Sequence, residues 1–202
     1  MLNDALGFLQ ALTVNLRIGF VTLLIGLAIG FIAATVRYRS TGFGSRVAGF
    51  LIGFLRAFPV YVLMFVAANL LASTGVFNAF STERNASIAL VVALLAYTIS
   101  ACSDACLTFI RHRALGQLTQ AWLLVPNVFQ IFVVTVMSSS VGAAIGVQEA
   151  VTYTLALAET YDTRLERIGL ILLVILFFAG MLGSSKYLVA ILSNRIRARR
   201  PS

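Results

Sequence analysis

The stretch IGFVTLLIGLAIGFIAATV, residues 18–36, contains no charged residue and has only two hydroxyl side chains. A helix needs about 20 mostly apolar residues to cross a hydrocarbon core of roughly 30 Å, so this stretch fits one membrane span. Four stretches of the same character follow it, and the predicted spans cover residues 18–36, 47–71, 86–110, 122–147 and 168–192. Because the connections between them are short, we expect residues 1–202 to form a single transmembrane domain.

The composition leads to the same fold class. Of the 202 residues, 60% are hydrophobic and 11% are charged, whereas about 45–50% apolar residues are typical of a soluble domain. A soluble fold could not bury so much apolar surface. The sequence therefore predicts an all-α integral membrane protein with five transmembrane helices.

Charged residues are distributed unevenly around the predicted spans, and the net charge is +8. Basic residues follow the first, third and fifth spans, whereas six of the seven acidic residues fall on the opposite side. The basic set is Arg37, Arg39, Arg46, Arg111, Arg113, Arg195, Arg197, Arg199 and Arg200, and the acidic set is Asp4, Glu83, Glu149, Glu159, Asp162 and Glu166. Short loops rich in Lys and Arg stay in the cytoplasm. We therefore predict that the amino terminus lies outside the cytoplasm and the carboxyl terminus inside it, with the basic residues in contact with anionic lipid rather than nucleic acid.

Arg56 and Pro59 interrupt the second predicted span, in the sequence FLRAFPVYV. Proline removes one backbone hydrogen bond and kinks a helix, and the freed carbonyl groups must then face protein or water. Two interpretations stay open. The kink lines a pathway with Arg56 beside it, or it is a packing kink next to an arginine that reaches the membrane surface.

Asp104 is the one acidic residue within a predicted span. Charged residues inside spans are costly and usually mark function, so Asp104 could titrate or bind a cation. In the other interpretation the third span ends earlier, and Asp104 lies near the cytoplasmic surface and pairs with Arg111 or His112.

The fourth predicted span carries Gln130 near its start and the hydroxyl residues Ser138, Ser139 and Ser140 near its end. Small hydroxyl side chains allow close packing between helices. The next segment, residues 148–167, has helical spacing with polar groups at both ends, which predicts a short helix at the outer surface, or dipping partly inward, rather than a sixth span.

The sequence contains no arrangement of residues that predicts catalysis. It lacks a Ser/His/Asp set, a Cys/His set, a pair of carboxylates with catalytic geometry and a Walker-type loop. Cys102 and Cys106 lie one helical turn apart, but no His or further Cys accompanies them, so we interpret them as packing residues rather than metal ligands. We expect neither enzymatic activity nor a metal site.

These features together resemble the transmembrane permease subunit of polar amino acid ABC importers, of the histidine/glutamine/arginine type. TVNLRIGFVTLLIGLAIGFIAATVRYRS resembles the opening helix of that family, and FLRAFPVYVLMF resembles its Phe-Arg-Gly-Thr-Pro signature, with Arg56 and Pro59 matching and Ala57 and Phe58 departing. VPNVFQIFVVTVMSSSVGAAIGVQEA resembles the proline-initiated fourth span and its closing Ser-x-x-x-Ile-Gly-x-x-Glu motif, here Ser139 or Ser140 with Ile145, Gly146 and Glu149.

The resemblance implies a type I ABC importer permease-like fold, a location in the bacterial inner membrane with a periplasmic amino terminus and a cytoplasmic carboxyl terminus, and a set of partners. These are a second permease subunit, cytoplasmic ATPase subunits that bind the ATP, and a periplasmic solute-binding protein, with no cofactor in this chain. It also implies that Arg56, Pro59 and Gln130 line or shape the transport path, and that Glu149 caps the fourth span near the outer gate.

The chain departs from the family in two places. The coupling helix, which docks into the ATPase and begins with Glu-Ala-Ala, is replaced by GQLTQAW, that is Gly116, Gln117, Leu118, Thr119, Gln120, Ala121 and Trp122. Residues 117–125 span only about 14 Å as a helix, so we infer that the docking element is missing. Met137 and Ser138 stand where the family has a Lys-Asp pair, so the charges that would contact a zwitterionic substrate are absent.

The leading hypothesis is the degenerate half of a heterodimeric permease, in an ABC importer for amino acids or related small polar solutes. Two alternatives remain, namely a structural or regulatory membrane subunit without transport activity and an energy-independent channel. The sequence does not indicate which solute is moved.

Overall fold

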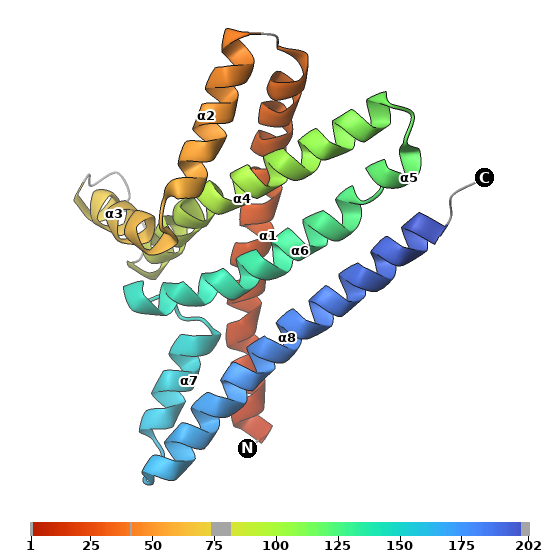
Figure 1. Cartoon of the computed structure of the whole chain (residues 1–202). Helices are drawn as coiled ribbons and strands as arrows, with labels where there is room; N and C mark the ends of the chain where they lie inside the picture. Colours follow the sequence, from red (N-terminus) through yellow and green to blue (C-terminus); the bar gives the residue numbers. More distant parts are fainter. Residues whose placement is uncertain (1, 41, 74–81, 199–202) are drawn as a thin grey trace.

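The computed structural model describes residues 2–40, 42–73 and 82–198, and these residues form helices and no strand (Figure 1). The elements are α1 (Leu2–Arg39), α2 (Phe43–Ala57), α3 (Val60–Ser73), α4 (Thr82–Ala114), α5 (Leu118–Ala121), α6 (Leu124–Ser138), the 3-10 helix η1 (Ser139–Ile145), α7 (Ala150–Glu159) and α8 (Arg164–Ala198). The prediction of an all-α chain is confirmed.

Within the described residues, four helical stretches are long and apolar enough to cross a membrane: Asn3–Arg39, Glu83–Ala114, Leu118–Ile145 and Arg164–Ile196. The pair α2 and α3 makes a fifth if it counts as one broken span. Four of the predicted spans fall within these stretches, and the fourth span, 122–147, ends two residues beyond Ile145. Helix α1 extends well beyond residues 18–36 on its amino-terminal side.

The second span differs from the single kinked helix that the sequence predicts. Helices α2 and α3 are bent by 91° relative to each other. The break falls at Phe58 and Pro59, where Phe58 has an extended backbone with φ −76° and ψ 126°. A proline disfavours helical geometry in the residue before it and cannot donate a backbone hydrogen bond. The helix therefore stops and restarts in a new direction.

Helices α1 and α4 run in the same direction and share the most extensive contact in the described chain. Ile18 of α1 clusters with Leu90 of α4, and further along both helices Ala34 clusters with Cys106. Two parallel spans need a returning span between them in the sequence, and the broken pair α2–α3 occupies that place.

Helix α6 runs antiparallel to α1, and α8 runs antiparallel to α6. Gly19 of α1 contacts Val136 near the end of α6. On the other side of α6, Met137 and Phe178 line one cavity, and Val125 and Ile196 line another. Helices α1, α4 and α8 therefore all point the same way.

The parallel direction of α1, α4 and α8 brings their basic carboxyl-terminal ends to one end of the bundle (Figure 1). Arg37, Arg111 and Arg195 belong to these ends, whereas Arg199 and Arg200 lie outside the described residues. A single basic face of the protein requires this arrangement. The compartment that this face contacts stays a prediction.

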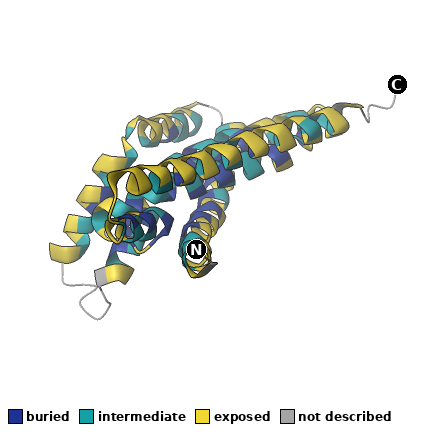
Figure 2. Cartoon of the chain, turned by 90° about the horizontal axis from the view of Figure 1, so that it is seen from below, coloured by how far each residue is buried: buried dark blue, intermediate teal, exposed yellow. Residues whose placement is uncertain are grey.

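Helix α8 is the least covered of the long helices. Only 11% of its most apolar stretch is buried inside the chain, whereas 56% of the corresponding stretch of α4 is buried. Figure 2 shows exposed residues along the helix that leads to the carboxyl terminus, with the buried residues gathered between the other helices. The apolar outer side of α8 therefore suits contact with lipid or with another membrane chain.

Glycines bring α1 and α4 into close contact. Gly26 and Gly30 lie one turn apart on α1, and a Cβ atom at Gly26 would come 2.6 Å from Thr98 Cγ2. At Gly30 the added atom would lie 2.8 Å from Cys102 Cβ and from the backbone nitrogen of Ser103. Small residues at this spacing are typical of tightly packed membrane helices.

We expect Gly30→Ala to destabilise the chain, because the added methyl group meets the backbone of α4, and overpacking of this kind costs about 1–3 kcal/mol. The measurement is the thermal unfolding midpoint of the purified chain in detergent, followed by size-exclusion chromatography. Gly180→Ala is the matched control, since a Cβ atom there has nothing within 4 Å. Equal midpoints for the two variants would contradict the close α1–α4 contact.

Candidate functional site

Glu149 is fully buried and forms the amino-terminal cap of α7. Its Oε2 accepts from the backbone N–H of Val151 at 3.0 Å, and its Oε1 accepts from that of Thr152 at 2.9 Å. A carboxylate at this position satisfies backbone donors that a helix start leaves unpaired, and it is favoured by the helix dipole. The prediction placed Glu149 as a cap of the fourth span, whereas the structure places it at the start of the next helix.

The joint between η1 and α7 depends on Gly146, which has a φ of +84°. The N–H of Val147 donates to the Gly142 carbonyl at 3.0 Å, and that of Gly146 donates to Ala143 at 3.3 Å, which is a Schellman helix ending. Only a residue without a side chain adopts this conformation at little cost. The Ile-Gly-x-x-Glu run is therefore a joint in which Gly146 ends one helix and Glu149 begins the next.

Asn15 of α1 connects Glu149 to η1. Its Nδ2 donates to Glu149 Oε2 and to Ser139 Oγ, both at 2.9 Å, and lies 3.4 Å from Ser140 Oγ. Its Oδ1 accepts from the Ala150 N–H at 3.1 Å. Asn15, Ser139 and Glu149 are all fully buried. We call Asn15, Ser139, Ser140 and Glu149 the outer polar cluster.

The residues that the sequence pattern selects include Ser139, Ser140 and Glu149 but omit Asn15. The only signal for Asn15 was a polar amide just before the first uncharged apolar stretch. The η1 helix, with seven residues, is also longer than the three or four usual for a 3-10 helix, which often marks a hinge or strained segment.

We expect Asn15→Ala to destabilise the chain by about 1–3 kcal/mol or more, because it leaves the buried carboxylate of Glu149 and the Ala150 N–H with fewer partners. Chemical or thermal unfolding in detergent measures the effect. Asn69→Ala is the control, since the exposed Asn69 donates only to the carbonyl group of Phe65 in its own helix. A loss at Asn69 as large as that at Asn15 would rule out a special role for the outer polar cluster.

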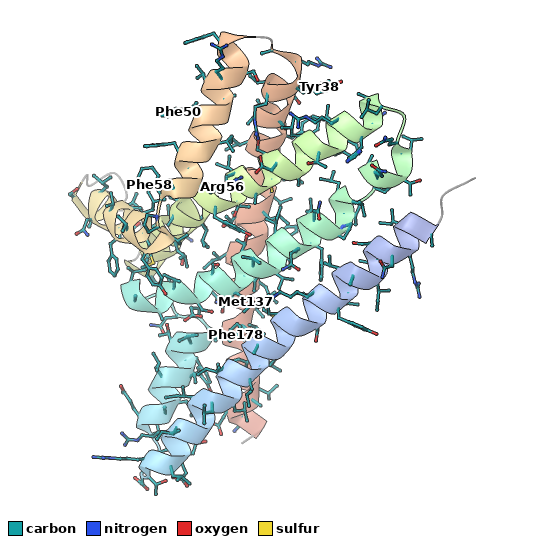
Figure 3. All side chains as sticks on the ribbon, in the orientation of Figure 1. Tyr38, Phe50, Arg56, Phe58, Met137 and Phe178 are labelled. Carbon is teal, nitrogen blue, oxygen red and sulfur yellow. The ribbon has the colours of Figure 1, made fainter. Side chains whose placement is uncertain are left out.

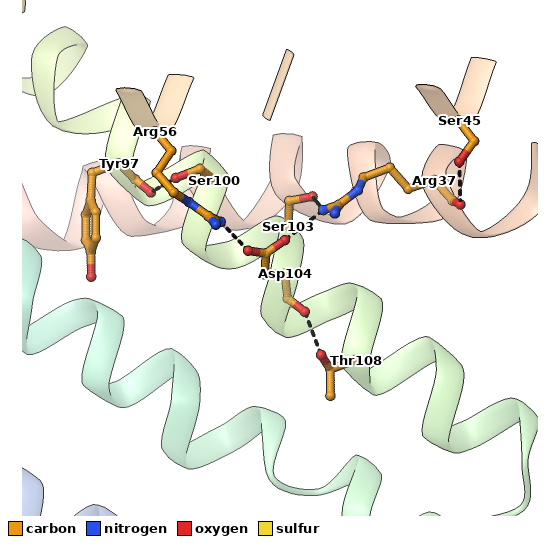
Figure 4. Close-up of polar contacts among 8 residues, drawn as sticks. All are labelled: Arg37, Ser45, Arg56, Tyr97, Ser100, Ser103, Asp104 and Thr108. Atoms are coloured by element: carbon orange, nitrogen blue, oxygen red, sulfur yellow. Dashed lines mark hydrogen bonds and ion pairs between the residues drawn. The ribbon is translucent and has the colours of Figure 1, made fainter. Parts of the chain in front are cut away.

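A second cluster, the inner charge cluster, consists of Arg37, Arg56 and Asp104 (Figure 4). Arg37 Nη1 lies 2.8 Å from Asp104 Oδ1 and 3.1 Å from Ser103 Oγ, and Arg56 Nη2 pairs with Asp104 Oδ2. The side chains of Arg37, Arg56 and Asp104 are 20%, 58% and 43% exposed. The cluster joins the end of α2, just before the break at Pro59, to α1 and α4.

Of the two interpretations of Asp104, the one that pairs it with Arg111 or His112 disagrees with the structure, in which Asp104 pairs with Arg37 and Arg56. Helix α4 continues to Ala114, so Asp104 lies well inside it, and His112 Nδ1 instead contacts Gln117 Oε1 at 2.7 Å. Both carboxylate oxygens of Asp104 are engaged by guanidinium groups. A bound cation would face two positive charges here, so the geometry disfavours the cation-site interpretation.

A double-mutant cycle can rank the two ion pairs. We expect the Arg37→Gln and Asp104→Asn pair to show a coupling energy of about 1–2 kcal/mol, and the Arg56→Gln and Asp104→Asn pair to show less than about 1 kcal/mol, because the more exposed pair is more strongly screened. Free energies of unfolding of the single and double variants, measured by denaturant titration in detergent, give both values. Arg39→Gln, at an exposed neighbouring position, is the control and should not couple with Asp104→Asn. A larger coupling for Arg56 than for Arg37 would reverse the assignment.

Met137 and Gln130 lie apart from both clusters, on the side of α6 that meets α8. Met137 lies beside Phe178 (Figure 3) and lines an apolar cavity of about 420 Å³ with residues of α7 and α8. Gln130 precedes Met137 by two helical turns and shares its face. Its buried Oε1 has no hydrogen-bond partner among residues 2–40, 42–73 and 82–198.

The structure therefore groups the predicted pathway residues in three places rather than along one lining. Ser139, Ser140 and Glu149 belong to the outer polar cluster, Arg56 and Pro59 lie at the broken span, and Gln130 and Met137 face α8. Ser138 is half-buried at the end of α6. Their role in transport stays a prediction.

The predicted coupling region, residues 116–122, contains a single helical turn. Gly116, with a φ of +71°, ends α4 in a Schellman motif, in which the Gln117 N–H donates to the His112 carbonyl at 2.9 Å. Helix α5 has four residues, and α6 begins at Leu124. In the part of the chain that the structure describes, no group of three or more His, Cys, Asp or Glu could hold a metal ion.

No protein-family model matches the chain, and no curated protein matches it. A comparison with solved structures finds a chain described as "Crystal structure of an amino acid ABC transporter with histidines", with a TM-score of 0.72 and 18% identity, which covers 96% of each chain. The chain has a type I ABC importer permease-like fold. At this identity the permease-like fold is what the two chains share, and amino acid transport is a property of that other protein.

Proposed function

We propose that this chain is a transmembrane subunit of an ABC importer for amino acids or related small polar solutes. The observation that carries the proposal is the permease-like fold over 96% of the chain, shared with an amino acid transporter. The Arg56–Pro59 and Ile145–Glu149 motifs, which resemble those of amino acid permeases, support the same substrate class. ATP binds to separate cytoplasmic subunits, because the sequence lacks a Walker-type loop.

The broken span is the part of the chain best suited to a transport path. Transporters commonly place solute sites at discontinuous helices near the middle of the membrane. The break at Phe58 and Pro59 leaves backbone groups that only protein or water can satisfy within a membrane, and Arg56 is exposed beside it. Arg56 and Pro59 would then border the path, with Gln130 shaping it and Glu149 holding the outer joint.

The chain acts as the degenerate half of a heterodimeric permease in this proposal. The single turn of α5 is too short to protrude as a docking helix, since four residues rise only about 6 Å. The cavity beside Met137 is apolar, which agrees with the loss of the Lys-Asp pair there. A conventional partner chain would supply the coupling helix and most of the polar contacts to the solute. The arginine-bearing end faces the cytoplasm of a bacterial inner membrane, and a periplasmic protein delivers the solute.

Affinity purification of the full chain from its native membrane tests the proposal. We expect mass spectrometry to identify a second permease chain and an ATPase, and we expect the complex in proteoliposomes to accumulate labelled polar amino acids only with ATP. Arg56→Ala should lower the uptake rate several-fold, whereas Arg39→Ala, exposed at the end of α1, should not.

Purified complexes without a second permease chain and an ATPase would contradict the proposal. ATP-dependent uptake that persists when this chain is removed would favour a structural or regulatory subunit. Uptake down a gradient without ATP would favour a channel.

A further inference from the structure

The arginine-bearing end of the bundle contains a concave apolar groove. Two adjoining cavities, of about 540 Å³ and 270 Å³, share Leu118, Trp122 and Val125 in their linings. Ile196 of α8 borders the first cavity, and Phe109 and Arg113 of α4 border the second. The groove therefore lies between the ends of α4 and α8, with the α5 turn and the start of α6 as its floor.

The rim of this groove is positively charged. Arg113 lines it directly, and Arg195 precedes the lining residue Ile196 in α8 without itself lining either cavity. Neither arginine forms an ion pair with any residue in the described ranges. Among the seven acidic residues, six belong to the opposite end of the spans, and Asp104 is already engaged by Arg37 and Arg56. The rim charge is therefore available to an external anion.

The apolar floor identifies the kind of anion. Trp122 is 63% exposed and Leu118 is also exposed, so the groove presents a large apolar surface that an inorganic anion would leave uncovered. Tryptophan is enriched at membrane–water interfaces, and basic pockets between helices at the cytoplasmic side bind the head groups of anionic lipids. An amphiphile that has an acyl chain and a phosphate matches both parts of the groove.

We propose that this groove binds one anionic phospholipid from the adjacent leaflet. The acyl chain lies on Leu118, Trp122 and Val125, and the phosphate accepts hydrogen bonds from the Arg113 guanidinium, whose planar fork suits a phosphate. Helix α5 has only four residues, so no longer helix fills the space between the ends of α4 and α8, and the groove stays open there. This site is independent of the proposed transport function.

The sequence allows a direct test, because Trp122 is the only tryptophan in the chain. Its fluorescence is quenched by brominated acyl chains that contact the indole ring. The full chain is reconstituted in bilayers of phosphatidylcholine with either brominated phosphatidylglycerol or brominated phosphatidylcholine, at the same mole fraction and ionic strength. We expect stronger quenching by the brominated phosphatidylglycerol, and competition by unbrominated phosphatidylglycerol.

Arg113→Gln should lower the relative affinity for phosphatidylglycerol about fivefold, because one arginine near an anionic surface contributes about that factor. Arg113→Lys should retain most of the preference. Arg111→Gln is the matched control. It removes the same charge from the same helix end, but a residue two positions away points to another face, whereas Phe109 and Arg113 share one face. Arg111→Gln should leave the preference unchanged.

Four results would overturn the proposal. Equal quenching by both brominated lipids would mean that only bulk lipid contacts Trp122. An equal loss of preference in Arg111→Gln and Arg113→Gln would mean a diffuse surface charge. Suppression by millimolar inorganic phosphate would mean a site for a soluble anion. Absence of quenching by either lipid in the natively purified complex would mean that a protein partner covers the groove.

Discussion

The close approach of α1 and α4 at Gly26 and Gly30 constrains most of the remaining structure. Because neither glycine has a side chain, the two parallel helices meet backbone to side chain over several turns. This contact brings Arg37 of α1 into reach of Asp104 on α4. Helix α6 covers the other face of this pair and packs against α1 at Val136 and against both helices at Leu124. The direction of α6 in turn fixes that of α8, so the arginine-bearing ends meet at one end of the bundle.

The two polar clusters differ in how their polar side chains are accommodated within an apolar bundle. In the outer polar cluster the buried side chains of Asn15, Ser139 and Glu149 are hydrogen-bonded inside the protein, and backbone and amide N–H groups donate to the Glu149 carboxylate. Such a network fixes a unique arrangement of α1, η1 and α7. In the inner charge cluster, Arg56 and Asp104 remain partly exposed next to the break between α2 and α3. Lipid alone cannot satisfy that surface, so it is the side of the chain that requires water or another protein.

Local sequence determines the spans and the break between α2 and α3, but it does not determine the contacts between helices. Apolar length identifies the spans because the bilayer thickness is fixed, and Pro59 locates the break because proline lacks an N–H. The 91° angle depends instead on what α3 packs against. Asn15 lies 134 residues from Glu149 and 124 from Ser139, and nothing local marks an amide that meets them. Asp104 pairs with Arg37 rather than with Arg111 because the pairing depends on the register between α1 and α4. Proximity in sequence does not determine it.

The length of the connection between α4 and α6 limits the structure that this connection can form. Gly116 ends α4 in a left-handed conformation, and Pro126 already belongs to the first turn of α6, where its missing N–H costs nothing. Only a few residues remain between these two fixed points, and they suffice for the single turn of α5. A protruding helix needs a chain segment that leaves the membrane surface and returns. Leu118 and Trp122 are exposed at the surface between α4 and α8. The short connection therefore leaves an apolar face, bordered by Arg113, at the level where the helices end.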